Sequence, residues 1–129
     1  MRVYNKWHSM IKKELKKMNL THPQFVVLAS LAYLSQNGNE VTQVMISKLS
    51  GIDVMTVSQI LGLLEKHDFV KRKEHSRDTR AKAVILNKKG EEVLQKAVPL
   101  VEQIDEIFFE KLDTDEEQFK HFLARLNEE

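Results

Sequence analysis

The sequence predicts a mainly α fold that is interrupted by one small β-hairpin. Two observations favour helices: apolar residues recur every three or four positions over most of the chain, and its 129 residues include only four Gly and two Pro. The third observation is a break in this period from residue 69 to residue 87, where two short apolar runs flank the charged stretch "KRKEHSRDTRAK" at 71–82. A chain of this length supports one domain, which we expect to cover residues 1–129.

Two helices are expected before residue 40. The first is amphipathic over residues 3–18, with the apolar positions Val3, Trp7, Met10, Ile11, Leu15 and Met18. The second begins at "THPQ", where Thr21 and Gln24 can form a capping box and Pro23 suits the first turn. It should end near Gly38, since glycine accepts the left-handed conformation that closes many helices.

A second pair of helices is expected within residues 42–67. Thr42 can cap a short helix, Gly51 permits a tight turn, and Asp53 can cap the next helix, at about 54–67. The predicted inward residues of the short helix are Met45, Ile46 and Leu49, and those of the longer helix are Val57, Ile60, Leu61 and Leu64. This layout is typical of a helix-turn-helix, whose second helix can enter a DNA major groove, but an αα-hairpin in a bundle shows the same pattern.

The segment that follows the helix pair favours the DNA-binding alternative. "FVKRK" and "AKAVILN" read as two strands with the loop "EHSRDT" between them. Asn87 can then cap a long helix over residues 88–111, which carries an apolar stripe made of Val93, Leu94, Ala97, Val98, Val101, Ile104 and Phe108. A hairpin with cations at its tip, directly after a helix-turn-helix, is a wing.

The stretch "LSGIDVMTVSQILGLLEKHDFVKRKEHSRDTRAKAVILNKKG" resembles the core of the MarR family of winged helix-turn-helix transcriptional regulators. The family's wing motif is matched by Asp78, Arg80, the strand "AVILN" and Lys89-Gly90. The resemblance covers about residues 20–112 and implies a homodimer, most simply a repressor, that binds a pseudo-palindromic operator and often responds to a small-molecule effector. It implies a winged helix-turn-helix part at 20–90 and long dimerisation helices at both termini, at 1–19 and 91–129.

Charge is distributed unevenly along the chain. Residues 1–90 hold 16 Lys and Arg against 7 Asp and Glu, a net charge of +9, whereas residues 91–129 hold 4 against 12, a net charge of −8. A basic body suggests a surface for a polyanion such as double-stranded DNA. The alternative is that charge has segregated by chance among solvated helix faces.

The charged loop has a predicted chemistry of its own. Arg77 and Arg80 present planar donors that suit phosphates or a narrow minor groove, and Asp78 is expected to orient Arg80 or the loop backbone. Further phosphate contacts are expected from Lys71, Arg72, Lys73 and Lys82. The alternative is a solvated hairpin whose charges protect its strand edges.

The predicted recognition helix carries no Arg on its outward face. Gln59 could pair with adenine, and Thr56 and Ser58 could reach phosphates or a thymine methyl group, so guanine is not the expected target. With this helix in the major groove and the wing, 71–86, at the minor groove, the candidate DNA-binding residues are Met55, Thr56, Ser58, Gln59, Lys73, Arg77, Asp78, Arg80 and Lys82.

Several functional classes find no support in the sequence. The five histidines form no metal-binding spacing, and neither a phosphate-binding glycine loop nor a nucleophile elbow is present, so we expect no enzyme, catalytic residue, metal or cofactor. The absence of cysteine and of a long apolar run favours a cytoplasmic protein with no membrane partner.

The terminal helices are expected to pair with a second copy of the chain. One apolar face contains Val3, Trp7, Ile11 and Leu15, and the other Phe119, Phe122, Leu123 and Leu126. The alternative is that both complete the core of the monomer. The family resemblance implies an effector pocket that Trp7, His8 or Tyr33 could line, although core packing is favoured for Trp7 and Tyr33. An alternative function is a winged-helix protein-protein interaction module that does not bind DNA.

Overall fold

The computed structural model describes residues 2–38, 40–74, 77 and 82–127, without the side chains of residues 111, 113, 114 and 116. It is mainly α with a small sheet, so the predicted fold class is confirmed. The elements are α1 (Arg2–Lys16), α2 (His22–Ser35), β1 (Val41–Thr42), α3 (Gln43–Ser50), α4 (Val54–Lys66), β2 (Val70–Glu74), β3 (Lys82–Leu86), α5 (Lys88–Phe109), a 3-10 helix (Glu110–Asp115) and α6 (Glu116–Leu126).

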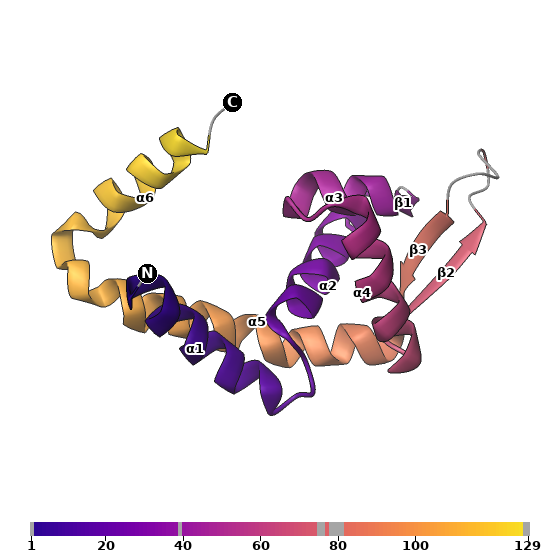
Figure 1. Ribbon diagram of the computed structural model, residues 1–129, viewed down its shortest axis with the longest axis horizontal. Helices are drawn as coiled ribbons and strands as arrows, with labels where there is room; N and C mark the ends of the chain where they lie inside the picture. The colour runs from indigo at the N-terminus through magenta and orange to yellow at the C-terminus, as the bar shows by residue number, and fades with distance from the viewer. Residues whose placement is uncertain (1, 39, 75–76, 78–81, 128–129) are drawn as a thin grey trace.

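The long helix α5 connects two differently shaped parts of the molecule (Figure 1). Near its beginning, α2, α3 and α4 lie together, and the β2–β3 hairpin projects from them. Near its end α1 packs alongside it, and α6 then extends away from the rest of the chain. The hairpin and α6 therefore project from opposite ends of the body.

The predicted starts of α2 and α3 are confirmed by capping bonds. The Gln24 backbone N–H donates to Thr21 Oγ1 over 3.2 Å, while Gln24 Oε1 accepts from the Thr21 N–H over 3.1 Å, which completes the capping box. Thr42 caps α3 by accepting the Met45 N–H over 3.2 Å. Gly51 follows α3 with a φ of +77°, the left-handed conformation that the tight turn requires.

The prediction that Leu49 faces inward is wrong. Ile46 is fully buried and Met45 packs against the core, as predicted, but Leu49 is exposed. Ser47 Oγ donates to the Ile52 carbonyl oxygen over 2.6 Å, and the Ile52 N–H donates to Ser50 Oγ over 3.2 Å. The serines of α3 thus bond to the turn that follows the helix, while Leu49 faces solvent.

The sheet contains a strand that the sequence pattern did not predict. The two-residue strand β1 pairs antiparallel with β3, with Val41 opposite Val84, in the strand order β1-β3-β2. The predicted hairpin strands are confirmed, and Glu74 lies opposite Lys82 at its outer end. Because β1 has only two residues, it offers no alternation from which to recognise it.

One hydrophobic core joins the helix-turn-helix to α1 and α5. Its fully buried side chains include Ile11 and Leu15 of α1, so the second half of this helix completes the core of the monomer. Trp7 packs against the same core, as predicted. Val3, one turn before Trp7, is exposed and contributes nothing to the core.

Aromatic rings and a carboxylate meet where α1, α2 and α5 pack together. Trp7 Nε1 donates to Asp105 Oδ1 over 2.8 Å, and the rings of Trp7 and His22 lie edge to face with centroids 5.6 Å apart. The His8 ring lies 5.3 Å from that of His22. Burial of the imidazole lowers the pKa of His22, the nearby His8 lowers it further, and Asp105 opposes both effects.

The start of α5 is packed tightly against the end of the α4–β2 turn. A Cβ atom on Gly90 would lie 2.3 Å from the Phe69 carbonyl oxygen, a distance that no side chain can occupy. Asn87 stands at the N-cap position, as predicted, but its side chain makes no capping bond. Instead Nδ2 donates to the Asp68 carboxylate and carbonyl oxygens over 3.2 and 3.3 Å, which ties the two segments together.

Replacing Gly90 by Ala should destabilise the fold by about 1–3 kcal/mol, because a backbone carbonyl must move to admit the methyl group. Gly62→Ala is the matched control, since a Cβ there would be in ordinary contact, 3.6 Å from Arg72 Nη2, inside a helix. That change should raise the stability by up to about 1 kcal/mol. Urea unfolding at fixed protein concentration measures both, and equal effects would contradict the packing argument.

The lowered pKa of His22 makes the stability depend on pH. Above the unfolded value of about 6.5 both states are neutral at this residue. As pH falls through this value toward the lower folded pKa, the unfolded chain binds the proton first, so stability decreases. His22→Gln should therefore lose less thermal stability than the wild type between pH 7.5 and pH 5.5, with His67→Gln as the control for loss of a histidine. Equal losses in wild type and His22→Gln would contradict this account.

Candidate nucleic-acid interface

Helix α4 has three distinct faces, of which the first is buried. Val57, Ile60, Leu61 and Leu64 pack into the core, as the sequence predicted. These positions repeat every three or four residues, so the remaining side chains of the helix must point elsewhere. The other two faces carry the polar and exposed residues on which the candidate interface depends.

The second face of α4 is an exposed stripe with little charge. Met55 leaves 73% of its surface exposed, and Gln59 lies one turn further along the helix. Leu63 and Lys66 continue the line at the next two turns, and both are exposed. A stripe with one cation, one amide and two apolar side chains can contact base edges and methyl groups, but it offers no arginine to guanine.

The third face of α4 is bonded to Arg72 of β2. Ser58, Gly62 and Glu65 are spaced so that they lie on one line along the helix. Arg72 Nε donates to Glu65 Oε1 over 2.7 Å, and its Nη2 lies 2.6 Å from the same oxygen. Its Nη1 donates to the hydroxyl and carbonyl oxygens of Ser58 over 3.1 and 3.3 Å and to Gln43 Oε1 of α3 over 3.0 Å.

The start of α4 carries a negative charge within the candidate interface. The Thr56 N–H donates to Asp53 Oδ1 over 2.9 Å, and Thr56 Oγ1 donates to Oδ2 over 2.6 Å, as expected for a capping carboxylate. The bond from the Thr56 hydroxyl, followed by that from its backbone N–H, lowers the pKa of Asp53. The hydroxyl groups of both Thr56 and Ser58 are thus engaged within the protein.

The β2–β3 hairpin, which packs next to α4, carries exposed cations. Lys71, Lys73 and Lys82 are exposed, and Arg77, in the loop, is also exposed. Because alternate residues of a strand point to opposite faces, Arg72 points away from the lysines on either side of it. The predicted contacts Asp78 and Arg80 lie outside the described residues.

Arg72 was predicted to contact phosphates, but its side chain points into the protein. Its guanidinium is directed at α3 and α4, and only 20% of its side-chain surface is exposed. Sequence reasoning overlooked two of its partners, Gln43 and Glu65. The available signal was Glu65 itself, since an acid on a helix expected to face DNA requires a neighbouring cation.

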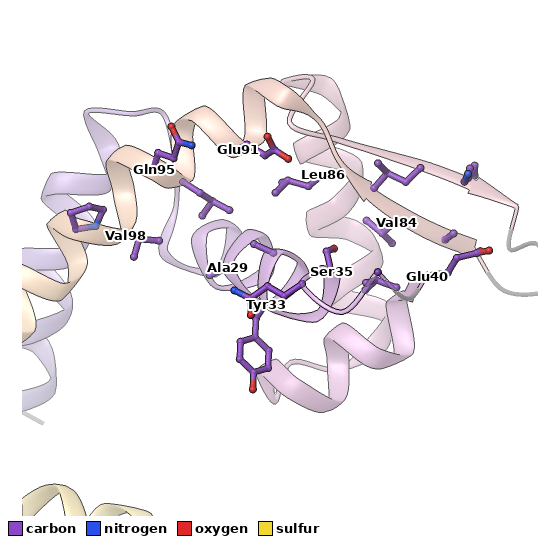
Figure 2. Close-up of a pocket in the computed structure, with 18 residues that line it drawn as sticks. Ala29, Tyr33, Ser35, Glu40, Val84, Leu86, Glu91, Gln95 and Val98 are labelled. Atoms are coloured by element: carbon purple, nitrogen blue, oxygen red, sulfur yellow. The ribbon is translucent and has the colours of Figure 1, made fainter.

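A groove of about 840 Å³ lies between α2, the sheet and α5. Ala29 and Tyr33 of α2 lie on one side, Glu91, Gln95 and Val98 of α5 on another (Figure 2). Tyr33 lines this groove and is 63% exposed, so the prediction that it packs in the core is wrong. Trp7 and His8 lie away from the groove, at the junction of α1, α2 and α5.

The described side chains of α6, from residue 117 to residue 126, are all exposed. Phe119 approaches Phe109 at the end of α5, with ring centroids 5.7 Å apart. The large apolar side chains of this helix that face solvent are Phe119, Phe122, Leu123 and Leu126. This apolar surface is continuous along one helix and has no cover within the described part of the chain.

No group of three or more His, Cys, Asp or Glu side chains among the described residues could hold a metal ion. No single described helix is both long and apolar enough to cross a membrane. The pair α3 and α4 reaches that length and hydropathy only when taken together, with a bend of 111° between them.

Comparison with known sequences points to DNA-binding regulators. Residues 16–104 match the family model described as the ArnR1-like winged-helix domain. The chain is 37% identical over 103 residues to the HTH-type transcriptional regulator YdcH of Bacillus subtilis, an alignment that covers 80% of this chain and 70% of YdcH.

Comparison with solved structures gives the same architecture. A mutant of MarR from Escherichia coli, in complex with operator DNA, superposes with a TM-score of 0.87 at 22% identity, covering 98% of this chain and 89% of that one. BpsR of Bordetella bronchiseptica, whose DNA binding is regulated by 6-hydroxynicotinic acid, gives 0.82 at 26% identity, covering 96% and 86%. The fold around α4 and the hairpin is thus one that occurs bound to DNA.

Proposed function

The chain belongs to the MarR family of winged helix-turn-helix transcriptional regulators, and we propose that it binds operator DNA through α4 and the β2–β3 hairpin. One observation carries the proposal: an exposed, nearly uncharged stripe runs along α4, and the β2–β3 hairpin that packs next to this helix carries exposed lysines. The stripe suits base edges in a major groove, and the lysines suit the phosphates that flank it.

In this proposal Met55 and Gln59 contact bases. The amide of Gln59 can donate to and accept from adenine, and the thioether side chain of Met55 can pack against a thymine methyl group. Thr56 and Ser58 flank the stripe, and their bonds to Asp53 and Arg72 hold them in fixed orientations. We therefore propose half-sites in which A and T predominate at the positions that α4 contacts.

The wing is proposed to approach the minor groove beside each half-site. Arg77 and Arg80 would enter the groove or contact its phosphates, with Asp78 orienting the loop. Lys73 and Lys82 are exposed near the outer end of the hairpin, where they can contact phosphates without reading sequence.

We propose that two copies of the chain form the binding unit. The exposed apolar side chains of α6 and of the first turn of α1 require cover, and a second copy can provide it with the same surfaces. The whole of residues 1–129 then acts as one domain, in which 20–90 bind DNA and 1–19 with 91–129 hold the dimer. Two copies of α4 about 34 Å apart would read a pseudo-palindromic operator.

The groove between α2, the sheet and α5 is proposed as the effector site. It lies between the DNA-binding elements and α5, so a ligand there could change the position of one relative to the other. The regulation of BpsR by 6-hydroxynicotinic acid supports a small-molecule effector. We propose a cytoplasmic repressor that is released by such a ligand and that has no enzymatic activity.

Selection of bound sequences from a random pool of double-stranded DNA tests the proposal. We expect a pseudo-palindrome whose half-sites are centred about one helical turn apart, because two symmetric copies of α4 would bind it. Sedimentation of the free protein at micromolar concentration should show a dimer. A monomer would contradict the assembly, and enrichment of no sequence would favour the protein-protein interaction module instead.

The selected operator then allows a test of the wing. Arg80→Ala should weaken binding at least about tenfold and reduce the dependence of affinity on salt, because a cation at the DNA is lost. Arg125→Ala in α6 removes the same charge far from the proposed interface and should leave affinity nearly unchanged. Full affinity in Arg80→Ala would remove the wing tip from the interface.

A further inference from the structure

We propose that Arg72 is a positioning residue that fixes the angle between the recognition helix and the wing, and that it makes no contact with DNA. The inference rests on the proposed function, since it assigns a role within the same DNA-binding surface. It concerns the one hairpin cation among the described residues whose side chain points at α3 and α4 rather than at solvent.

The bonds of Arg72 join three elements of the winged helix-turn-helix. From β2, the guanidinium reaches Glu65 and Ser58 of α4 and Gln43 of α3. Nε, Nη1 and Nη2 each have a partner, at distances between 2.6 and 3.3 Å. A guanidinium directs its donors in a fixed planar fork, so these partners together determine both the position and the orientation of the side chain.

The charges at this site also argue against a phosphate contact. Glu65 shares one carboxylate oxygen between Nε and Nη2, which neutralises the guanidinium. A phosphate at the same place would have to displace this carboxylate or lie beside it, and two anions repel each other at such a distance. The lysines on either side of Arg72 point to the opposite face of the strand and make no comparable bonds among those described.

The angle between the hairpin and α4 decides where the outer end of the wing lies. The strand continues for two residues beyond Arg72, to Glu74, which is about 7 Å at roughly 3.3 Å per residue. A rotation of the hairpin by about 10° at Arg72 would then displace this end of the strand by about 1 Å, which is more than the range of about 0.5 Å over which N–H···O distances vary. A small loosening at Arg72 would thus be enough to separate the wing from DNA while α4 stays in the groove.

The decisive variants are Arg72→Lys and Glu65→Ala. Lysine keeps the positive charge but cannot bond three partners in one plane, so we expect operator affinity to fall about tenfold, nearly as far as in Arg72→Ala. Glu65→Ala removes a negative charge from a DNA-binding surface, which by charge alone would tighten binding. The positioning role predicts that it weakens binding instead.

Matched controls isolate the effect of charge. Glu74→Ala removes an acid from the same strand and should leave binding unchanged or tighten it. Lys71→Ala removes a neighbouring cation and should reduce the salt dependence by about one counterion, with only a few-fold loss of affinity. Only variants whose circular dichroism shows the wild-type helix content are compared.

A measurement without DNA completes the test. In the free protein, amide hydrogen exchange in 70–74 and 82–86 should accelerate in Arg72→Lys and Glu65→Ala, while the amides of α2 and α5 keep their protection. Because this readout does not involve DNA, it separates the positioning role from the proposed function, which would fail if the wild type selected no operator.

Two results would overturn the inference. Wild-type operator affinity in Arg72→Lys would mean that the positive charge alone matters, as in a phosphate contact. Tighter binding by Glu65→Ala, together with unchanged exchange in the hairpin, would mean that the carboxylate only opposes DNA and positions nothing.

Discussion

The carbonyl group of Phe69 is the point on which the winged helix-turn-helix depends. Its oxygen accepts the Asn87 N–H over 2.9 Å and lies where a side chain on Gly90 would be. At this one position the end of the α4–β2 turn meets the residue that follows β3 and the first turn of α5. The base of the hairpin is thereby held against the long helix, and any movement of α5 reaches the wing through a contact between backbone atoms.

Above this fixed base, Arg72 determines what the rest of the hairpin does. The backbone contact at Phe69 locates the two strand ends, but a short antiparallel ribbon twists readily along its length. Bonds from Arg72, three residues beyond Phe69, to α3 and α4 remove much of that freedom. The backbone junction at Phe69 holds the base of the hairpin, and the guanidinium of Arg72 holds it further along β2. Together they fix the position of the hairpin relative to α4.

Much of this fold could be predicted because its signals are local. Capping residues such as Thr21 and Thr42 act within a turn, and the buried face of α4 follows from spacing alone. The failures have other causes: Leu49 is exposed on a helix whose serines bond to the following turn, and β1 exists because β3, far along the chain, offers it a partner. The candidate site shows the same division, since Met55 and Gln59 follow from helical period, whereas the partners of Arg72 lie 7, 14 and 29 residues away.

Helix α6 has few contacts within the described part of the chain. An isolated helix of 11 residues is only marginally stable in water, and among the described residues α6 contacts mainly the adjacent 3-10 helix and Phe109. In the proposed dimer, the second copy that covers Phe122, Leu123 and Leu126 would contribute the free energy that keeps α6 helical. Folding of this segment and association would then form a single equilibrium, so the helix content of the protein would depend on its concentration.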